Sequence, residues 1–126
     1  MKRQNGVILS GQLGELRVEQ VAVGDTVTRV VIATLITDHP AYGGHHRVLF
    51  PAEHALEVQA FAALTAGNLE VTVEGWLRST PASGASPPGA VVVVDRVIYL
   101  NVTQAQRDQV ARARVASQHR STKPAT

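Results

Sequence analysis

One helical pattern stands alone in the first hundred residues of this chain, which otherwise read as β-strands. A long β-branched run covers residues 26–37, and the most regular strand pattern is the alternation of apolar and polar residues over residues 69–78. The helix is predicted over residues 52–66, after three strand patterns and before two. This order restricts the fold to architectures in which five strands share one core with a single helix.

The remaining strands are bounded by turn residues. They are predicted over residues 7–14, 45–50 and 90–102, the last with a break at Asp95-Arg96. Gly11 and Gly14 fall late in the first strand, where glycine marks a bulge or a sharp bend. The first strand is therefore expected to curve strongly enough to pair on both sides.

The helix is expected to plug one end of the structure through an apolar stripe. That stripe is predicted to contain Leu56, Ala60, Ala63 and Leu64, with Phe61 on its flank. Three strands, a helix and two strands is the plan of the OB-fold, so the predicted fold class is all-β, a five-stranded OB-fold barrel with one helix between strands 3 and 4. An open α+β sandwich of the same elements is the alternative.

Charge divides the chain into two parts. Residues 1–103 have a net charge of −2, from seven basic and nine acidic side chains, and residues 104–126 have a net charge of +4, from five basic side chains and Asp108. We predict an OB-fold domain over 1–103 and a basic C-terminal tail over 104–126, partly helical or disordered. Thr103 and Gln106 fit a capping box, so a short helix is expected to Ser117, with disorder from about Gln118. A cationic tail indicates an anionic partner or, alternatively, a solubilising segment.

The sequence lacks the motifs that would indicate several classes of function. The chain has no cysteine, which excludes a thiol nucleophile and a cysteine-type zinc site. It has no apolar run long enough to span a membrane and no signal-peptide core, so a cytoplasmic, nucleoid-associated location is predicted. No nucleophile elbow or phosphate-binding loop occurs, so we predict a non-enzyme. Adjacent His45 and His46 would point to opposite faces of a strand, so no metal site is predicted.

Four segments resemble, in the right order, the family of bacterial single-stranded DNA-binding proteins. They are Asn5–Gly14 (the family's N-x-V-x-L-x-G-x-L), Val31–Thr34, His46–Phe50 (H-R-V-L-F, one residue shorter than the family's H-R-V-V-L-F) and Val71–Arg78 (V-x-V-E-G-x-L-R). A related group of short OB-fold proteins, the primosomal replication protein N type, shares the barrel and pairs as a dimer. The resemblance extends from about Asn5 to Val102.

The resemblance implies binding of single-stranded DNA without catalysis, metal or cofactor, by a homo-oligomer (dimer or tetramer) that works in replication, repair or recombination. Other replication proteins are possible partners, RNA is not excluded, and no membrane partner is expected. Only 4% of the residues are aromatic, and His45 stands where the family usually carries a tryptophan. Because stacking aromatics supply much of the affinity in such proteins, we predict weaker and more salt-sensitive binding than is typical.

The predicted nucleic-acid-binding residues are cationic or can stack on bases. They are Arg29, Tyr42, His45, Arg47, Trp76 and Arg78 in the body, and Arg107, Arg112 and Arg114 in the tail. Trp76 shares the polar side of its strand with Arg78, so it could stack on a base or fill a subunit interface. His45 and Arg47 could contact bases and phosphates or could belong to an ordinary solvated strand face.

Two other functions stay open on the sequence alone. The barrel could be an assembly or adaptor module with weak or no DNA binding, in which Trp76 is buried between subunits. More distantly, the same groove could take an oligosaccharide or a small ligand. The slightly acidic body and the shortage of aromatics favour the first of these alternatives.

Overall fold

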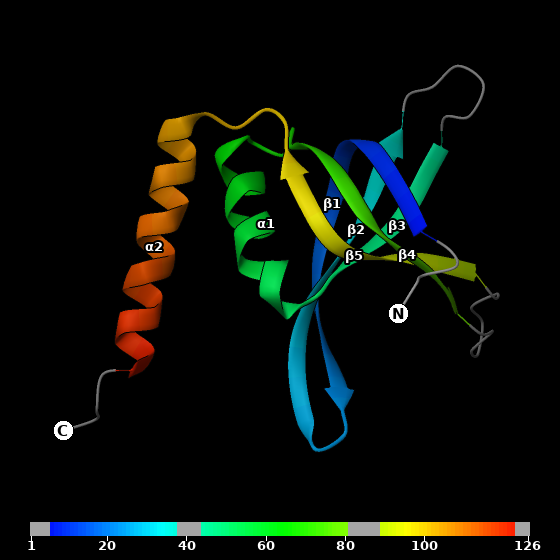
Figure 1. The fold of residues 1–126 in the computed structure, drawn as a ribbon, viewed down its shortest axis with the longest axis horizontal. Coiled ribbons are helices and arrows are strands. Elements are labelled where there is room, and N and C mark those ends of the chain that lie inside the picture. Colours follow the sequence, from blue (N-terminus) through cyan, green and yellow to red (C-terminus); the bar gives the residue numbers. More distant parts are fainter. Residues whose placement is uncertain (1–5, 38–43, 81–88, 123–126) are drawn as a thin grey trace.

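The fold, given by a computed structural model, is described for residues 6–37, 44–80 and 89–122. Its elements are β1 (Gly6–Val23), β2 (Thr26–Thr37), β3 (Gly44–Phe50), α1 (Ala52–Leu64), β4 (Glu70–Thr80), β5 (Gly89–Tyr99) and α2 (Gln104–Thr122). The five strands curl into one sheet, α1 closes one end of it, and α2 lies beside α1 (Figure 1).

The sheet is a closed barrel with the strand order β1-β2-β3-β5-β4. Closure depends on β1, which pairs with β4 over residues 6–12 and with β2 over residues 12–23. The β3–β5 pair is parallel and joins Val48 to Val92, while the other pairs are antiparallel. The predicted five-stranded OB-fold barrel is confirmed, and the open α+β sandwich is wrong because no strand is left at an unpaired edge of the barrel.

Strand alternation places the core inside the barrel. The largest fully buried side chains are Phe50, Leu13, Leu35, Leu69, Val31, Val48, Val58, Val71, Val73 and Val94. Nine of these ten come from strands or their margins, and Val58 comes from α1, so the helix completes the core from one end. As the alternation of strand 3 predicts, Phe50 points inward with Val48.

The buried side of α1 differs from the predicted stripe. Ala55, Val58 and Phe61 face the barrel, whereas Leu56 is 69% exposed. The helix has apolar residues on both sides, so periodicity alone offered two stripes, and the barrel takes the one that inserts Phe61. After the helix, Ala66 has a positive φ of 54° and the Gly67 amide donates to the Ala62 carbonyl at 2.9 Å, which ends the helix as a Schellman turn.

The first two strands form a hairpin longer than predicted. The β1–β2 register shifts between Leu13 and Leu16, so the predicted irregularity near Gly14 is a β-bulge. A Cβ on Gly11 would overlap the carbonyl oxygen of Ile36, which explains why only glycine fits there. Beyond the bulge the hairpin continues as a two-stranded ribbon that projects from the barrel to the turn at Gly24 (Figure 1).

The C-terminal helix begins with the predicted capping box. The Gln106 amide donates to Thr103 Oγ1 at 3.1 Å, and the Thr103 amide donates to Gln106 Oε1 at 2.8 Å. The helix runs to Thr122, so the prediction that helical structure ends near Ser117 was wrong. Two side chains tie its first turn to the body: Gln106 donates to the Leu64 carbonyl and Arg107 to the Tyr99 carbonyl. Neither α1 nor α2, the helices of the described ranges, has the length and apolarity needed to cross a membrane.

Tyr99 lies under α1 and α2 with its hydroxyl buried. Its ring packs on Phe61 with a centroid separation of 4.4 Å, and within the described residues its Oη has no hydrogen-bond partner. Burial, reinforced by the negative charge of Glu57, raises the pKa of this hydroxyl above its ordinary value. The hydroxyl thus loses its hydration on folding and gains no bond in return.

Replacing Tyr99 with phenylalanine is expected to raise the free energy of unfolding by about 1 kcal/mol, because it removes a buried unpaired donor. The gain should grow above pH ~10, where the unfolded tyrosine can ionise but the folded one cannot, so that the wild-type protein alone loses stability. Urea denaturation of both proteins at neutral pH and near pH 10.5 measures both effects. A less stable phenylalanine variant would show that the hydroxyl is bonded in solution.

Candidate nucleic-acid interface

The outward side of β3, β5 and β4 forms one continuous surface, which we call the strand face. Register places Trp76 of β4 opposite Val93 of β5, and Val93 in turn beside Leu49 of β3. One step along, Arg78 is opposite Val91. Continuing the parallel β3–β5 register by one residue brings Arg47 to the other side of Val91. The strand face therefore consists of Arg47, Leu49, Trp76, Arg78, Val91 and Val93.

Two cations flank the apolar centre of this surface. Arg47 and Arg78 are both exposed and stand on strands separated by β5, so their backbones lie about 10 Å apart. Trp76 is half-buried, two residues before Arg78 and on the same side of β4. Of the predicted binding residues in the body, the structure brings Arg47, Trp76 and Arg78 together.

The surface continues from β3 onto β2 and β1. A shallow hollow of about 230 Å³ beside Arg47 is lined by Glu15, Arg17, Ile32, Ala33 and Thr34 as well. Thr34 pairs with Arg47, and Ile32 pairs with Leu49, so the apolar centre extends across the β2–β3 pair. In the OB-fold the β2–β3 surface is the usual binding region for oligonucleotides and oligosaccharides.

The valines at the centre of the strand face were missed by the reasoning from sequence. Val91 and Val93 are 5% and 8% exposed although they point away from the barrel interior. Their signal is the run Val91–Val94, which has no alternation, because an uninterrupted apolar run indicates a strand covered on both sides. Because both side chains are almost fully buried, they pack beneath the strand face and are not themselves open to a ligand.

A β-bulge lies next to the tryptophan in the β4–β5 pair. Glu74 pairs with Arg96 but Gly75 pairs with Val94, so Asp95 is the extra residue. The break predicted at Asp95-Arg96 is therefore a bulge, and the strand continues through it to Tyr99. The carboxylate of Glu74 lies 3.5 Å from Arg96 Nη1. This contact offsets the negative charge nearest to Trp76, which would otherwise repel a phosphate.

The histidines of β3 diverge as alternation predicts. His45 is exposed two residues before Arg47 on the same side, whereas His46 is half-buried and its Nε2 lies 3.2 Å from the Thr37 hydroxyl. His45 therefore extends the polar edge of the strand face, and His46 does not take part. Across residues 6–37, 44–80 and 89–122, no group of three potential metal ligands occurs.

Other predicted residues lie apart from the strand face. Arg29 and Val31 are two residues apart on β2, so their side chains point to the same side of the strand. Ile32 points to the other side. Tyr42 falls outside the described residues. The tail arginines lie on α2, at the far side of α1 from the barrel (Figure 1). There, Arg107 is bound to the Tyr99 carbonyl at 2.8 Å, while Arg112 and Arg114 remain exposed.

Comparison with solved structures identifies the fold, whereas comparison of sequences finds no match. No family model matches the sequence, and no curated protein is detectably similar to it. A single-stranded DNA-binding protein (SSB) of Plasmodium falciparum, solved in complex with single-stranded DNA, aligns with a TM-score of 0.55 at 16% identity, covering 80% of this chain and 98% of that one.

Two further structures give the same result. The dimeric N-terminal domain of PriB from Thermoanaerobacter tencongensis aligns with a TM-score of 0.58 at 15% identity, covering 79% of this chain and all of that one. An SSB domain of a Synechococcus protein aligns with a TM-score of 0.52 at 19% identity, covering 77% and 97% of the two chains. The barrel of this chain thus has the fold shared by SSB domains and PriB.

Proposed function

We propose that this chain is a sequence-nonspecific single-stranded DNA-binding protein that acts without catalysis, as a homo-oligomer, in replication, repair or recombination. The observation that carries the proposal is the composition of the strand face. The half-buried Trp76 lies beside the buried Val93, and the exposed Arg47 and Arg78 stand on the two strands next to β5. A partly exposed indole close to two exposed cations suits a strand whose bases are unpaired and whose phosphates are accessible.

The chemistry assigns a role to each group. The Trp76 indole stacks on a base, which contributes about 1–3 kcal/mol per base and accepts any of the four. The guanidinium groups of Arg47 and Arg78 neutralise phosphates and release counterions. A duplex keeps its bases stacked on each other, so it offers nothing to Trp76 and binds through charge alone.

The comparisons support this choice among the functions that an OB-fold can serve. The P. falciparum protein with the same barrel was solved with single-stranded DNA, and this chain covers 98% of its length. The PriB domain was solved as a dimer, which is consistent with a homo-oligomer here. A cytoplasmic, nucleoid-associated location and contacts with other replication proteins follow from the same proposal.

Fluorescence anisotropy with a labelled oligo-dT strand tests the function. We expect saturable binding at low salt, much weaker binding to a duplex of equal length, and a steep loss of affinity as salt rises. An oligo-U strand measured in parallel reports whether RNA is also accepted. Equal affinity for single strand and duplex would overturn the stacking role, and no binding at low salt would leave the assembly-module alternative.

A further inference from the structure

The hollow beside Arg47 brings unlike charges to one point on the outside of the barrel. It has a volume of about 230 Å³ and lies where β1, β2 and β3 adjoin. Two apolar residues of β2 and four polar side chains line it: Ile32, Ala33, Glu15, Arg17, Thr34 and Arg47. The hollow therefore presents one carboxylate, two guanidinium groups and one hydroxyl to the same small ligand.

The β-bulge of β1 places the carboxylate there. The β1–β2 register shifts between Leu13 and Leu16, so Glu15 lies within the bulge, and Arg17 follows it with regular pairing. A bulge re-aims the side chain that it carries, and bulges are common beside functional sites. As a result Glu15 and Arg17 line the hollow from the β1 side, and Arg47 lines it from β3.

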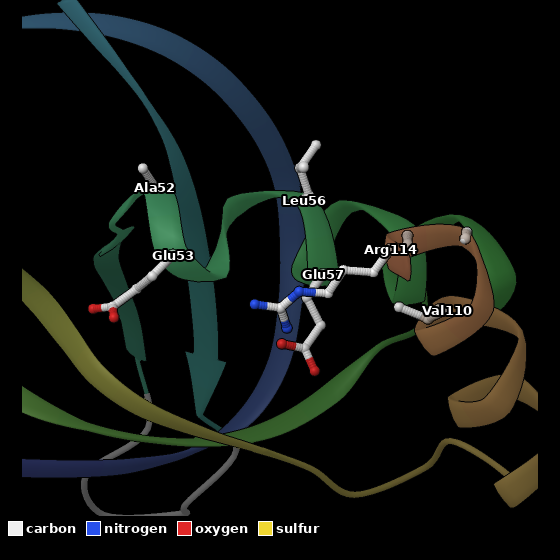
Figure 2. Close-up of a pocket in the computed structure, with 8 residues that line it drawn as sticks. Ala52, Glu53, Leu56, Glu57, Val110 and Arg114 are labelled. Atoms are coloured by element: carbon white, nitrogen blue, oxygen red, sulfur yellow. The ribbon is translucent and has the colours of Figure 1, made fainter. Parts of the chain in front are cut away.

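The carboxylate in the hollow is not neutralised by the chain itself. Arg17 Nη2 lies 3.2 Å from Glu19 Oε1, and within the described residues Glu15 has no ion pair. The groove of about 400 Å³ between α1 and α2 is different, because there Arg114 and Glu57 point toward one another (Figure 2). Glu15 thus remains available to accept hydrogen bonds from a ligand, next to arginines that donate them.

This combination of groups restricts the chemistry of the ligand. A carboxylate only accepts hydrogen bonds and a guanidinium only donates them, so the ligand must carry donors and acceptors side by side. In a single strand of DNA the phosphates and sugars carry acceptors alone, so the donors must belong to a base. Guanine has two neighbouring donors, N1–H and the 2-amino group, and two neighbouring acceptors, O6 and N7. The other three bases each have a single donor group.

We infer that the hollow is a guanine-preferring subsite on the path of the bound strand, with Glu15 as its selective residue. The Glu15 carboxylate accepts from N1–H and the 2-amino group, and Arg17 donates to O6 and N7. Five N–H donors allow Arg17 to keep its contact with Glu19 at the same time. The inference rests on the proposed single-strand binding and goes beyond it, because Trp76 accepts any base whereas this subsite distinguishes one.

Competition titrations measure the preference. A labelled oligo-dT strand is displaced by unlabelled oligo-dT, or by the same strand with one central thymine replaced by guanine or by hypoxanthine, which lacks the 2-amino group. The wild-type protein should prefer the guanine strand about fivefold, the lower end of what a bidentate contact to a base contributes. The hypoxanthine strand should lose most of this gain. Equal affinity for guanine and thymine, or for guanine and hypoxanthine, would overturn the inference.

Glu15→Ala should abolish the preference, because it removes both accepting oxygens from an exposed position. It should also bind oligo-dT slightly more tightly, since a negative charge beside the strand is lost. The matched control is Asp25→Ala, which removes the same charge from the exposed turn of the ribbon and should keep the preference.

The same titrations separate this inference from the proposed function. A guanine preference that survives Glu15→Ala, or that is lost equally in Asp25→Ala, would contradict the role of Glu15. Equal binding of all strands by the wild-type protein would overturn the subsite and leave single-strand binding intact. Failure to bind any strand would overturn both.

Discussion

A double variant, Arg47→Glu with Arg78→Glu, is expected to bind oligo-dT about 100-fold more weakly than the wild-type protein at low salt. Each arginine makes a charge-assisted contact to a phosphate, and losing two such contacts costs about 3 kcal/mol, which is two powers of ten in affinity. The slope of log affinity against log salt should also become shallower by about 1.4, since two fewer phosphates are neutralised on a single strand. Anisotropy titrations at several salt concentrations measure both quantities.

The matched control is Arg29→Glu. It changes the same charge by the same amount on an exposed strand residue, but on the side of β2 that faces away from Ile32. We expect it to weaken binding less than threefold, against about tenfold for Arg47→Glu alone. Equal losses at Arg29 and Arg47 would show that net charge, rather than the strand face, attracts the DNA.

Gly75→Ala is expected to lower the free energy of unfolding by about 3 kcal/mol, a large fraction of the stability of a small domain. Gly75 is buried where β4 pairs with β1 and β5, and a Cβ there would overlap the backbone carbonyl oxygen of Val93. Backbone cannot move aside as a flexible side chain can, so the β4–β5 pair must separate. Urea denaturation followed by far-UV circular dichroism measures the loss.

Gly6→Ala is the control for this change. Gly6 lies on β1 opposite Trp76, and a Cβ there would meet no atom within 4 Å. The same substitution should therefore change the free energy of unfolding by less than about 0.5 kcal/mol. If both alanine variants are equally stable, the close approach of β4 and β5 at the bulge is not present in solution.

The strand pattern predicted most of the fold because each strand obeys a local rule. Alternation over residues 69–78 gave the inward and outward sides of β4, and the capping box at Thr103 gave the start of α2. The buried side of α1 was harder to predict. α1 offers two apolar stripes, and the choice between Leu56 and Val58 as the buried residue depends on the shape of the barrel end, which no local pattern encodes.

The candidate site was predicted only in part, because local patterns identify single residues but not their neighbours on other strands. Trp76 was identified because a large indole on the polar side of a strand does not fit the barrel core, and Arg78 because it follows two residues later on the same side. Which residues of β5 and β3 lie next to them depends on the register between strands far apart in the sequence, and no local pattern determines that register. The separation of Arg29 from Arg47 depends on the same register, because it is set by the phase of β2 relative to β3.

The most direct test of the account uses its single tryptophan, because the chain has one and it lies on the strand face. Titration with unlabelled oligo-dT should quench Trp76 fluorescence to saturation at low salt, and the midpoint should move to much higher concentrations when the salt is raised fourfold. Full binding by anisotropy with unchanged Trp76 fluorescence would place the DNA elsewhere on the molecule and contradict the account.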